Sequence, residues 1–418
     1  MFVIVRVYFL HIGDNMNETL NKSMNKALAF VLAAVFLLVL GTFISATILT
    51  PYAKTMGASW FQIGILSGCM YVVRLFIGTP TGRLADRKGS LVVLKYSLLL
   101  YPFIAIAYWL SFNIYLLIGA RLLHGVASAM MLPMAMAYVG QTSPKGMEGR
   151  YMSIYNLCIM LASGIGPFIS TIVAGLFSHR ATFIMLFGLS VIALLILLFS
   201  QKERGMEYIS YNTLDISKKE RFNAVVLFKN TKLMALSFAN IALSVVASLV
   251  GFFLILFLEY KGLGFIFTGS VLAIYNIIAG IVQLPLGRII DRYNKFHITL
   301  LSGLETAVTL LIFTLSSNIF IIGAAIILLA FGTATLSSAT SALSIIVGRE
   351  TGMGSTMGFL STANSIGMIF GCISLSLMPT MKYKYEAFFY FSSAIVIVST
   401  CLFSILWAKS NCKSKRSC

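Results

Sequence analysis

The sequence predicts an all-α membrane protein in which twelve transmembrane helices form two similar six-helix halves. Three observations predict this fold. Of the 418 residues, 59% are hydrophobic and only 11% are charged, whereas soluble domains carry about a quarter charged residues. The chain contains twelve long apolar runs, and patterns in its first half recur in the second at a constant spacing. The polar residues are too few to cover a water-soluble particle of this size.

Each apolar run is long enough to cross a bilayer, which takes about 20 residues of helix. Two junctions, at 111–113 and 316–318, are short and rich in small polar residues that favour tight turns. The predicted spans are 27–50, 60–81, 91–111, 113–138, 151–176, 181–200, 233–258, 266–286, 296–316, 318–346, 357–378 and 386–408.

Basic residues predict the orientation of these spans. If alternate loops are assigned to two sides, 23 of the 31 Lys and Arg residues lie on the side of the termini and 5 lie opposite. By the positive-inside rule both termini are cytoplasmic, and we expect a plasma-membrane location. The net charge of +18 is therefore an orientation signal that brings bases close to anionic lipid. It does not predict a nucleic-acid partner.

A duplication accounts for the two halves. The pattern P-x-G-R-x-x-D-R at Pro80–Arg87 recurs at Pro285–Arg292, a shift of 205 positions. The same shift relates Gly149 to Gly354 and Gly166 to Gly371. Six spans per copy keep the two copies in the same orientation, as in parallel repeats. We expect an N-terminal segment 1–26, a bundle 27–200, a cytoplasmic linker 201–232, a second bundle 233–408 and a basic tail 409–418.

Several motifs resemble those of the major facilitator superfamily. Gly82–Gly89, GRLADRKG, resembles the signature G-x-L-A-D-R-x-G between helices 2 and 3, and Gly287–Lys295 is a weaker copy of it. Arg121–Gly125 resembles the helix 4 motif R-x-x-Q-G, with His124 where Gln is common. Gly164–Pro167 resembles the helix 5 motif of exporters, and Pro51–Ala53 the twelve-span drug-efflux branch. The resemblance implies the major facilitator fold and transport by alternating access.

The duplicated loop is the predicted conformational switch. Glycine tolerates the backbone angles of a tight turn, which suits Gly82 and Gly89. Asp86 can pair with neighbouring bases or face the positive end of a helix. The resemblance implies that this helix end lies near Gly354–Thr356, and that Asp291 faces Arg150–Tyr151. The alternative is a basic loop that only fixes topology. The predicted switch residues are Gly82, Arg83, Asp86, Arg87, Gly89, Gly287, Arg288, Asp291 and Arg292.

Polar residues inside the spans are the candidates for substrate binding or ion coupling, because a charge in a membrane is costly unless it is paired or solvated. Arg121 and His124 share a helix face. Glu305 is the one carboxylate in the middle of a span. Each candidate also has a structural alternative as a contact between helices. The candidates are Arg74, Arg121, His124, Asn156, Asn240, Tyr275, Asn276, Gln283, Glu305 and Asn364.

These features predict a secondary transporter of a small molecule. We expect proton-coupled efflux of hydrophobic or amphipathic compounds by a monomer. The alternative within this class is uptake or exchange of a polar metabolite, a sugar or an organic anion. A membrane receptor or scaffold that transports nothing is the alternative from another class. The sequence contains no phosphate-binding loop, metalloprotease motif or credibly spaced catalytic triad. We therefore expect neither an enzyme nor a cofactor or metal.

Overall fold

The structure is a computed structural model that describes residues 18–200, 224–254, 257–258, 265–315, 318–376 and 385–416. Within these residues the secondary structure is helical, without strands. Twelve of the helices are long and apolar enough to cross a membrane. The predicted all-α fold with twelve spans is therefore confirmed.

The described helices follow the predicted order. The first half contains α2 (Glu18–Thr55), α3 (Trp60–Lys88), α4 (Ser90–Trp109), α5 (Ile114–Thr142), α6 (Glu148–Leu176) and α7 (Ala181–Ser200). The second half contains the short α9 (Ala224–Lys229), then α10 (Thr231–Ser248) with a π-helical turn η1 (Leu249–Phe253), α12 (Phe265–Arg292), α13 (Lys295–Leu315), α14 (Ile319–Thr351), α15 (Met353–Ser376) and α16 (Tyr385–Arg416).

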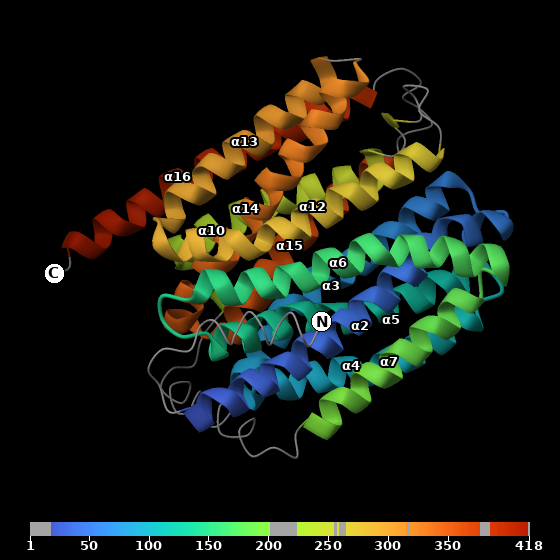
Figure 1. Cartoon of the computed structure of the whole chain (residues 1–418), viewed down its shortest axis with the longest axis horizontal. Helices are drawn as coiled ribbons and strands as arrows, with labels where there is room; N and C mark the ends of the chain where they lie inside the picture. The colour runs from blue at the N-terminus through green and yellow to red at the C-terminus, as the bar shows by residue number, and fades with distance from the viewer. Residues whose placement is uncertain are drawn as a thin grey trace.

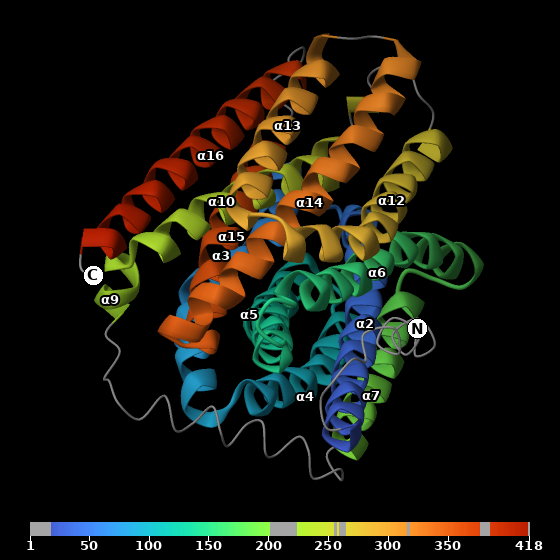
Figure 2. The same cartoon turned by 60° about the vertical axis from the view of Figure 1, so that its left-hand side comes forward.

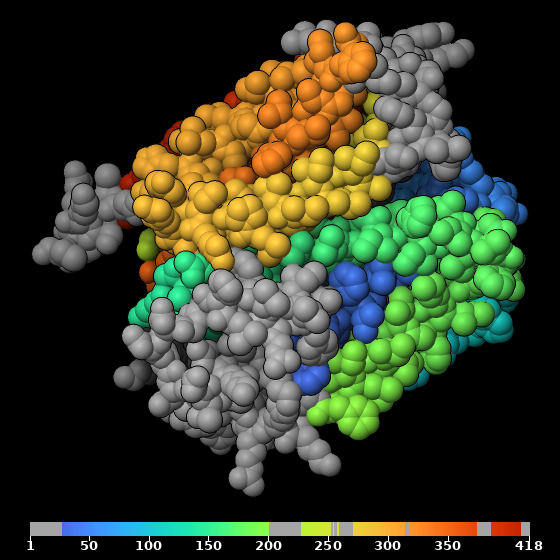
Figure 3. Space-filling model, viewed as in Figure 1, coloured from blue at the N-terminus to red at the C-terminus, as the bar shows by residue number. Residues whose placement is uncertain are grey.

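The two halves lie side by side as separate bundles (Figures 1 and 2). Helices α3 and α15 pack together across the boundary, as do α6 and α12. The surfaces of α6 and α12 meet along one side of the molecule (Figure 3). Most residues of the first apolar core, such as Leu38 and Phe183, belong to the first half, and residues such as Phe257 and Phe389 fill a core within the second half. Three residues of the second half also pack into the first core: Ile345, Met353 and Met357. Each bundle is therefore packed largely on itself.

Polar residues begin helices in both halves. Asn113 accepts the backbone N–H of Leu116 at 2.9 Å and caps α5. Asn318, which is 205 positions later, accepts the N–H of Phe320 at 2.9 Å and caps α14. Such caps satisfy backbone donors that a helix start leaves free. The short junctions predicted at these positions are therefore also helix starts.

Several helices extend beyond their predicted spans at the end of the molecule that we call the basic end, where α3 meets α4 and α12 meets α13. Helix α3 continues to Lys88 and α12 to Arg292, because charged residues end the apolar run without breaking the helix. The expectation that Gly82 forms a turn is wrong: Gly82 lies inside α3. Gly89, at φ 92°, alone separates α3 from α4.

Candidate functional site

Two aspartates join the halves at the basic end. The Asp86 carboxylate accepts the backbone N–H groups of Gly354 at 2.7 Å and Ser355 at 2.8 Å, at the start of α15. The Asp291 carboxylate accepts those of Gly149 at 2.7 Å and Arg150 at 3.2 Å, at the start of α6. The first turn of a helix offers free N–H donors and a partial positive charge. Both carboxylates thus hold a helix of the other half.

The bases of the duplicated loop do not hold Asp86. No ion pair within 4.0 Å joins its carboxylate to Arg83, Arg87 or Lys88, all of which lie in the described part of α3. Arg87 is exposed, whereas the Nε and Nη2 atoms of Arg83 are buried and have no hydrogen-bond partner. The helix start is therefore the partner of Asp86.

The bases of the second copy lie at the surface. Arg288 and Arg292 are both exposed on the last turns of α12. The guanidinium of Arg292 lies 6.0 Å from the ring of Tyr293. A role for these bases in switching stays a prediction.

Glycines bring the backbones of the two halves together beside each aspartate. A Cβ at Gly82 would lie 2.4 Å from the carbonyl oxygen of Gly354, and one at Gly358 would lie 2.4 Å from that of Gly78. At the equivalent place in the second copy, a Cβ at Gly287 would lie 2.9 Å from the Cα of Arg150. Gly82 and Gly287 therefore serve close helix approach across the boundary.

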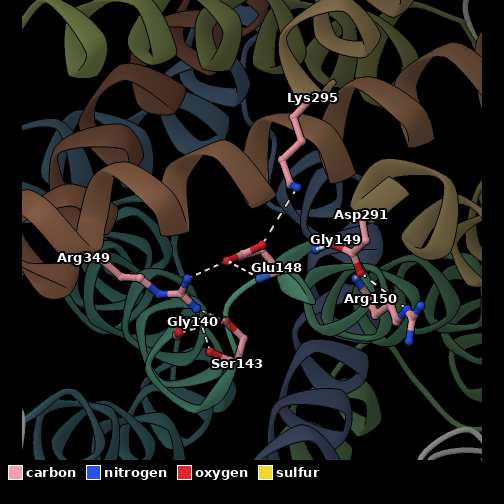
Figure 4. A network of polar contacts seen from close by, with 9 residues as sticks. Gly140, Ser143, Glu148, Gly149, Arg150, Asp291, Lys295 and Arg349 are labelled. Atoms are coloured by element: carbon pink, nitrogen blue, oxygen red, sulfur yellow. Dashed lines mark hydrogen bonds and ion pairs between the residues drawn. The ribbon is translucent and has the colours of Figure 1, made fainter. Parts of the chain in front are cut away.

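A second polar cluster at the basic end was not predicted from the sequence. We call Ser143, Glu148, Lys295 and Arg349 the Glu148 network (Figure 4). The Glu148 carboxylate binds the Arg349 guanidinium and lies 3.9 Å from the Lys295 ammonium. Arg349 also donates to the carbonyl of Ser143 at 2.6 Å. Only 4% of the Glu148 side chain is exposed, so this carboxylate is buried against bases of the other half.

The Glu148 network has no counterpart at the other crossing. The positions related to Glu148, Arg349 and Lys295 by the 205-residue shift hold Met353, Pro144 and Ser90. The signal in the sequence was an isolated acid in a basic loop. Its partners, Lys295 and Arg349, lie far from it along the chain, so no local pattern indicated them.

We expect Glu148 and Arg349 to be energetically coupled. Hydrogen bonds to charged groups contribute about 1.5–3 kcal/mol each, and a buried charge without its partner is costly. Glu148→Gln and Arg349→Met should each lower the apparent Tm of the purified protein. The Tm decrease of the double variant should be much smaller than the sum of the two single decreases.

The surface pair Lys232–Glu350 provides the matched control. Its atoms lie 3.3 Å apart, with side chains 29% and 55% exposed. Exposed pairs contribute about 0–1 kcal/mol, so Lys232→Met and Glu350→Gln should show little coupling. Equal coupling in the two pairs would contradict a special role for the Glu148 network.

Arg74, Arg121 and His124 gather inside the first half, next to α15. Arg74 and Arg121 are each 8% exposed, and His124 is fully buried. Arg74 Nη2 donates to Ser361 Oγ of α15 at 3.2 Å. His124 Nδ1 lies 3.0 Å from the hydroxyl of Tyr108. The structure therefore brings together three of the predicted candidates, and His124 has a partner on α4.

Other candidates form contacts between helices. Ser338 of α14 donates to the Gln283 side-chain oxygen and lies 3.4 Å from Asn156 Nδ2. Ser163 of α6 donates to Asn276 Oδ1 of α12 at 3.0 Å. The candidates Asn156, Gln283 and Asn276 thus take part in contacts that join the halves or adjoin their boundary.

The remaining uncharged candidates lie within the second half. The Tyr275 hydroxyl contacts that of Thr333 at 2.9 Å. Asn240 donates to the Leu236 carbonyl of its own helix at 2.9 Å. Asn364 is partly buried in α15. These contacts favour structural roles for Tyr275 and Asn240.

Glu305 lies away from the arginines, between α13 and α14. Its Oε1 accepts from Thr309 Oγ1 of its own helix at 3.2 Å, while its Oε2 is buried without a partner. A Cβ at Gly332 of α14 would coincide with this carboxylate. The side chain therefore occupies a notch that glycine leaves in the neighbouring helix.

Comparison with known proteins supports this architecture. The chain matches the family model of the Major Facilitator Superfamily over residues 31–372 and 236–411. It is 24% identical over 363 residues to an uncharacterized MFS-type transporter, MJ1560, of Methanocaldococcus jannaschii, covering 85% of this chain and 92% of that protein. It is 26% identical over 163 residues to the quinolone resistance protein NorA of Staphylococcus aureus, covering 38% of this chain and 41% of NorA.

Solved structures have the same fold. The human organic anion transporter MFSD10 (TETRAN) matches with a TM-score of 0.75 at 13% identity, covering 91% of this chain and 99% of that one. The proton:xylose symporter XylE matches with a TM-score of 0.75 at 10% identity, covering 93% and 96%. With the duplicated loop, the twelve helices and the family match over most of the sequence, this chain belongs to the major facilitator superfamily of multi-pass membrane transporters.

Proposed function

We propose that this chain is a monomeric secondary transporter of the plasma membrane that exports hydrophobic or amphipathic compounds in exchange for protons. The observation that carries the transport part of this proposal is the pair of contacts made by Asp86 and Asp291, each with a helix start of the other half. Such contacts stabilise one arrangement of two rigid bundles and must break in the other. The basic end, and with it both termini, faces the cytoplasm in this proposal.

Partial similarity to NorA, a quinolone resistance protein, supports export of a drug-like compound. The buried arginines favour a second candidate, uptake or exchange of a polar metabolite such as a sugar or an organic anion. Both candidates use the same alternating-access motion, so the direction of net movement separates them.

Inverted membrane vesicles test the export proposal. With an imposed proton gradient, acid inside, we expect lipophilic compounds from a panel to dissipate the gradient and to accumulate. Vesicles without the protein are the control, and right-side-out vesicles test the opposite direction. A response to no lipophilic compound, together with proton-driven uptake of a polar metabolite into right-side-out vesicles, would favour the second candidate.

A further inference from the structure

Two buried guanidinium groups in the first half have no acidic partner. No described carboxylate lies within 4.0 Å of Arg74 or Arg121. Arg74 Nε and both Nε and Nη1 of Arg121 are buried donors without hydrogen-bond partners. Each side chain is nevertheless more than nine-tenths buried, at 8% exposed. Buried unpaired donors are costly, and buried charges without a counter-charge cost more.

Among the described residues, the surroundings of the two arginines supply no negative charge. Tyr71, Tyr101 and His124 lie within electrostatic range of both guanidinium groups. The other titratable neighbours from α3, α4, α6 and α15 are Cys69, Tyr108, Tyr155 and Cys372. Tyrosine and cysteine are ordinarily neutral at pH 7, and a histidine there can only be neutral or positive. The cluster therefore keeps a positive charge.

A buried apolar cluster adjoins the charges. Met70 and Tyr71 of α3 pack with Cys372 of α15, and Met368 and Ile369 lie against them. The ring of Tyr71 lies 5.8 Å from the Arg74 guanidinium carbon. Methionine adapts its shape to irregular apolar partners. The two guanidinium groups and the buried apolar cluster thus meet at the boundary between the halves.

The two buried arginines of the first half have no counterpart in the second half. The 205-residue shift relates Arg74 to Ala279 and Arg121 to Ile326. Ala279 and Ile326 are both buried in the apolar core of the second half. A bound molecule is therefore expected to place its negative group toward α3 and α5.

We propose that Arg74 and Arg121 bind the anionic group of an organic anion, whose apolar part lies against Met70, Tyr71 and Met368. Guanidinium groups suit this task because they stay charged and bind carboxylates through two parallel hydrogen bonds. The inference rests on the proposed transport function, because it names the class of molecule that the transporter carries.

Binding of simple probes to the purified full-length protein tests the inference without transport. The probes are 4-butylbenzoate and its neutral analogue 4-butylbenzamide, with Kd measured by calorimetry in lipid nanodiscs. We expect the benzoate to bind at least about tenfold more tightly than the amide, since charge-assisted hydrogen bonds are roughly twice as strong as neutral ones. Acetate, which lacks the apolar part, should bind more weakly than the benzoate.

Arg74→Gln and Arg121→Gln should each weaken benzoate binding by about tenfold or more and leave amide binding unchanged. Arg180→Gln is the matched control, because Arg180 contacts Tyr52 at 2.9 Å outside this cluster. If the Gln variants do not fold, the ratio of the Kd values of the benzoate and the amide for the wild-type protein still tests the inference. Equal binding of benzoate and amide, acetate binding as tight as benzoate, or unchanged binding in folded variants would overturn the inference.

The experiments distinguish failure of the export proposal from failure of the anion site. Arginine-dependent benzoate binding with no export of any compound in the vesicles would refute export and keep the anion site. Export of lipophilic compounds with unchanged rates in both arginine variants would support export and refute the anion site.

Discussion

We expect Gly82→Ala to reduce transport about tenfold or more. A methyl group at Gly82 would lie 2.4 Å from the carbonyl oxygen of Gly354, far inside van der Waals contact. Both atoms belong to helix backbones, so the halves must separate to make room. Overpacking of this kind costs about 1–3 kcal/mol, and 1.4 kcal/mol is a factor of ten in an equilibrium. The arrangement closed at the basic end should therefore become rare.

Two measurements check this result: transport in vesicles and labelling of an introduced Ser153→Cys by a maleimide. Ser153 is fully buried at the boundary, so its labelling should rise when the basic end opens. Gly119→Ala is the matched control, because a Cβ there meets no atom within 4 Å. Wild-type transport by Gly82→Ala would show that close approach of α3 and α15 is unnecessary for the cycle.

The double variant Asp86→Asn with Asp291→Asn should lose nearly all transport while the protein still reaches the membrane. Asparagine keeps one acceptor oxygen but loses the charge that interacts with the helix start. Charge-assisted hydrogen bonds contribute about 1.5–3 kcal/mol, so each single variant should transport about tenfold more slowly. Since both contacts break in the same movement, their losses should combine in the double variant.

Transport is measured per molecule of protein in the membrane, which separates activity from expression. Glu350→Gln is the control, because Glu350 lies at the same end of the molecule with 55% of its side chain exposed. Unchanged transport in the double variant would refute a switching role for the two aspartates and leave the loops as orientation signals.

The sequence predicted the large-scale fold because its strongest signals are local. The thickness of the bilayer sets the length of each apolar run, so the spans can be located from the sequence. The repeated loop reveals the duplication without any knowledge of the fold. The resemblance also indicated which helix start Asp86 faces, and the structure places Gly354 and Ser355 there. The role of Gly82 was misjudged because a turn and a close helix crossing both require glycine.

Contacts between distant segments could not be predicted. The partners of Glu148 lie on two helices of the other half and meet it only in the folded chain. Likewise, the sequence identified Arg74 and Arg121 as costly charges without showing that Arg74 Nε and two donors of Arg121 remain unpaired. Both results depend on which helix faces pack together, and apolar periodicity alone leaves this open.

The largely separate cores of the two halves have a consequence for cooperativity. If each bundle moves as one body, the contacts of Asp86, Asp291 and Glu148 are lost in a single event. Reversing a two-state equilibrium from 1:99 to 99:1 takes about 5.5 kcal/mol, which is comparable to three contacts of about 1.5–3 kcal/mol each. The switch would then be all-or-none, with partly open forms scarcely populated at any moment.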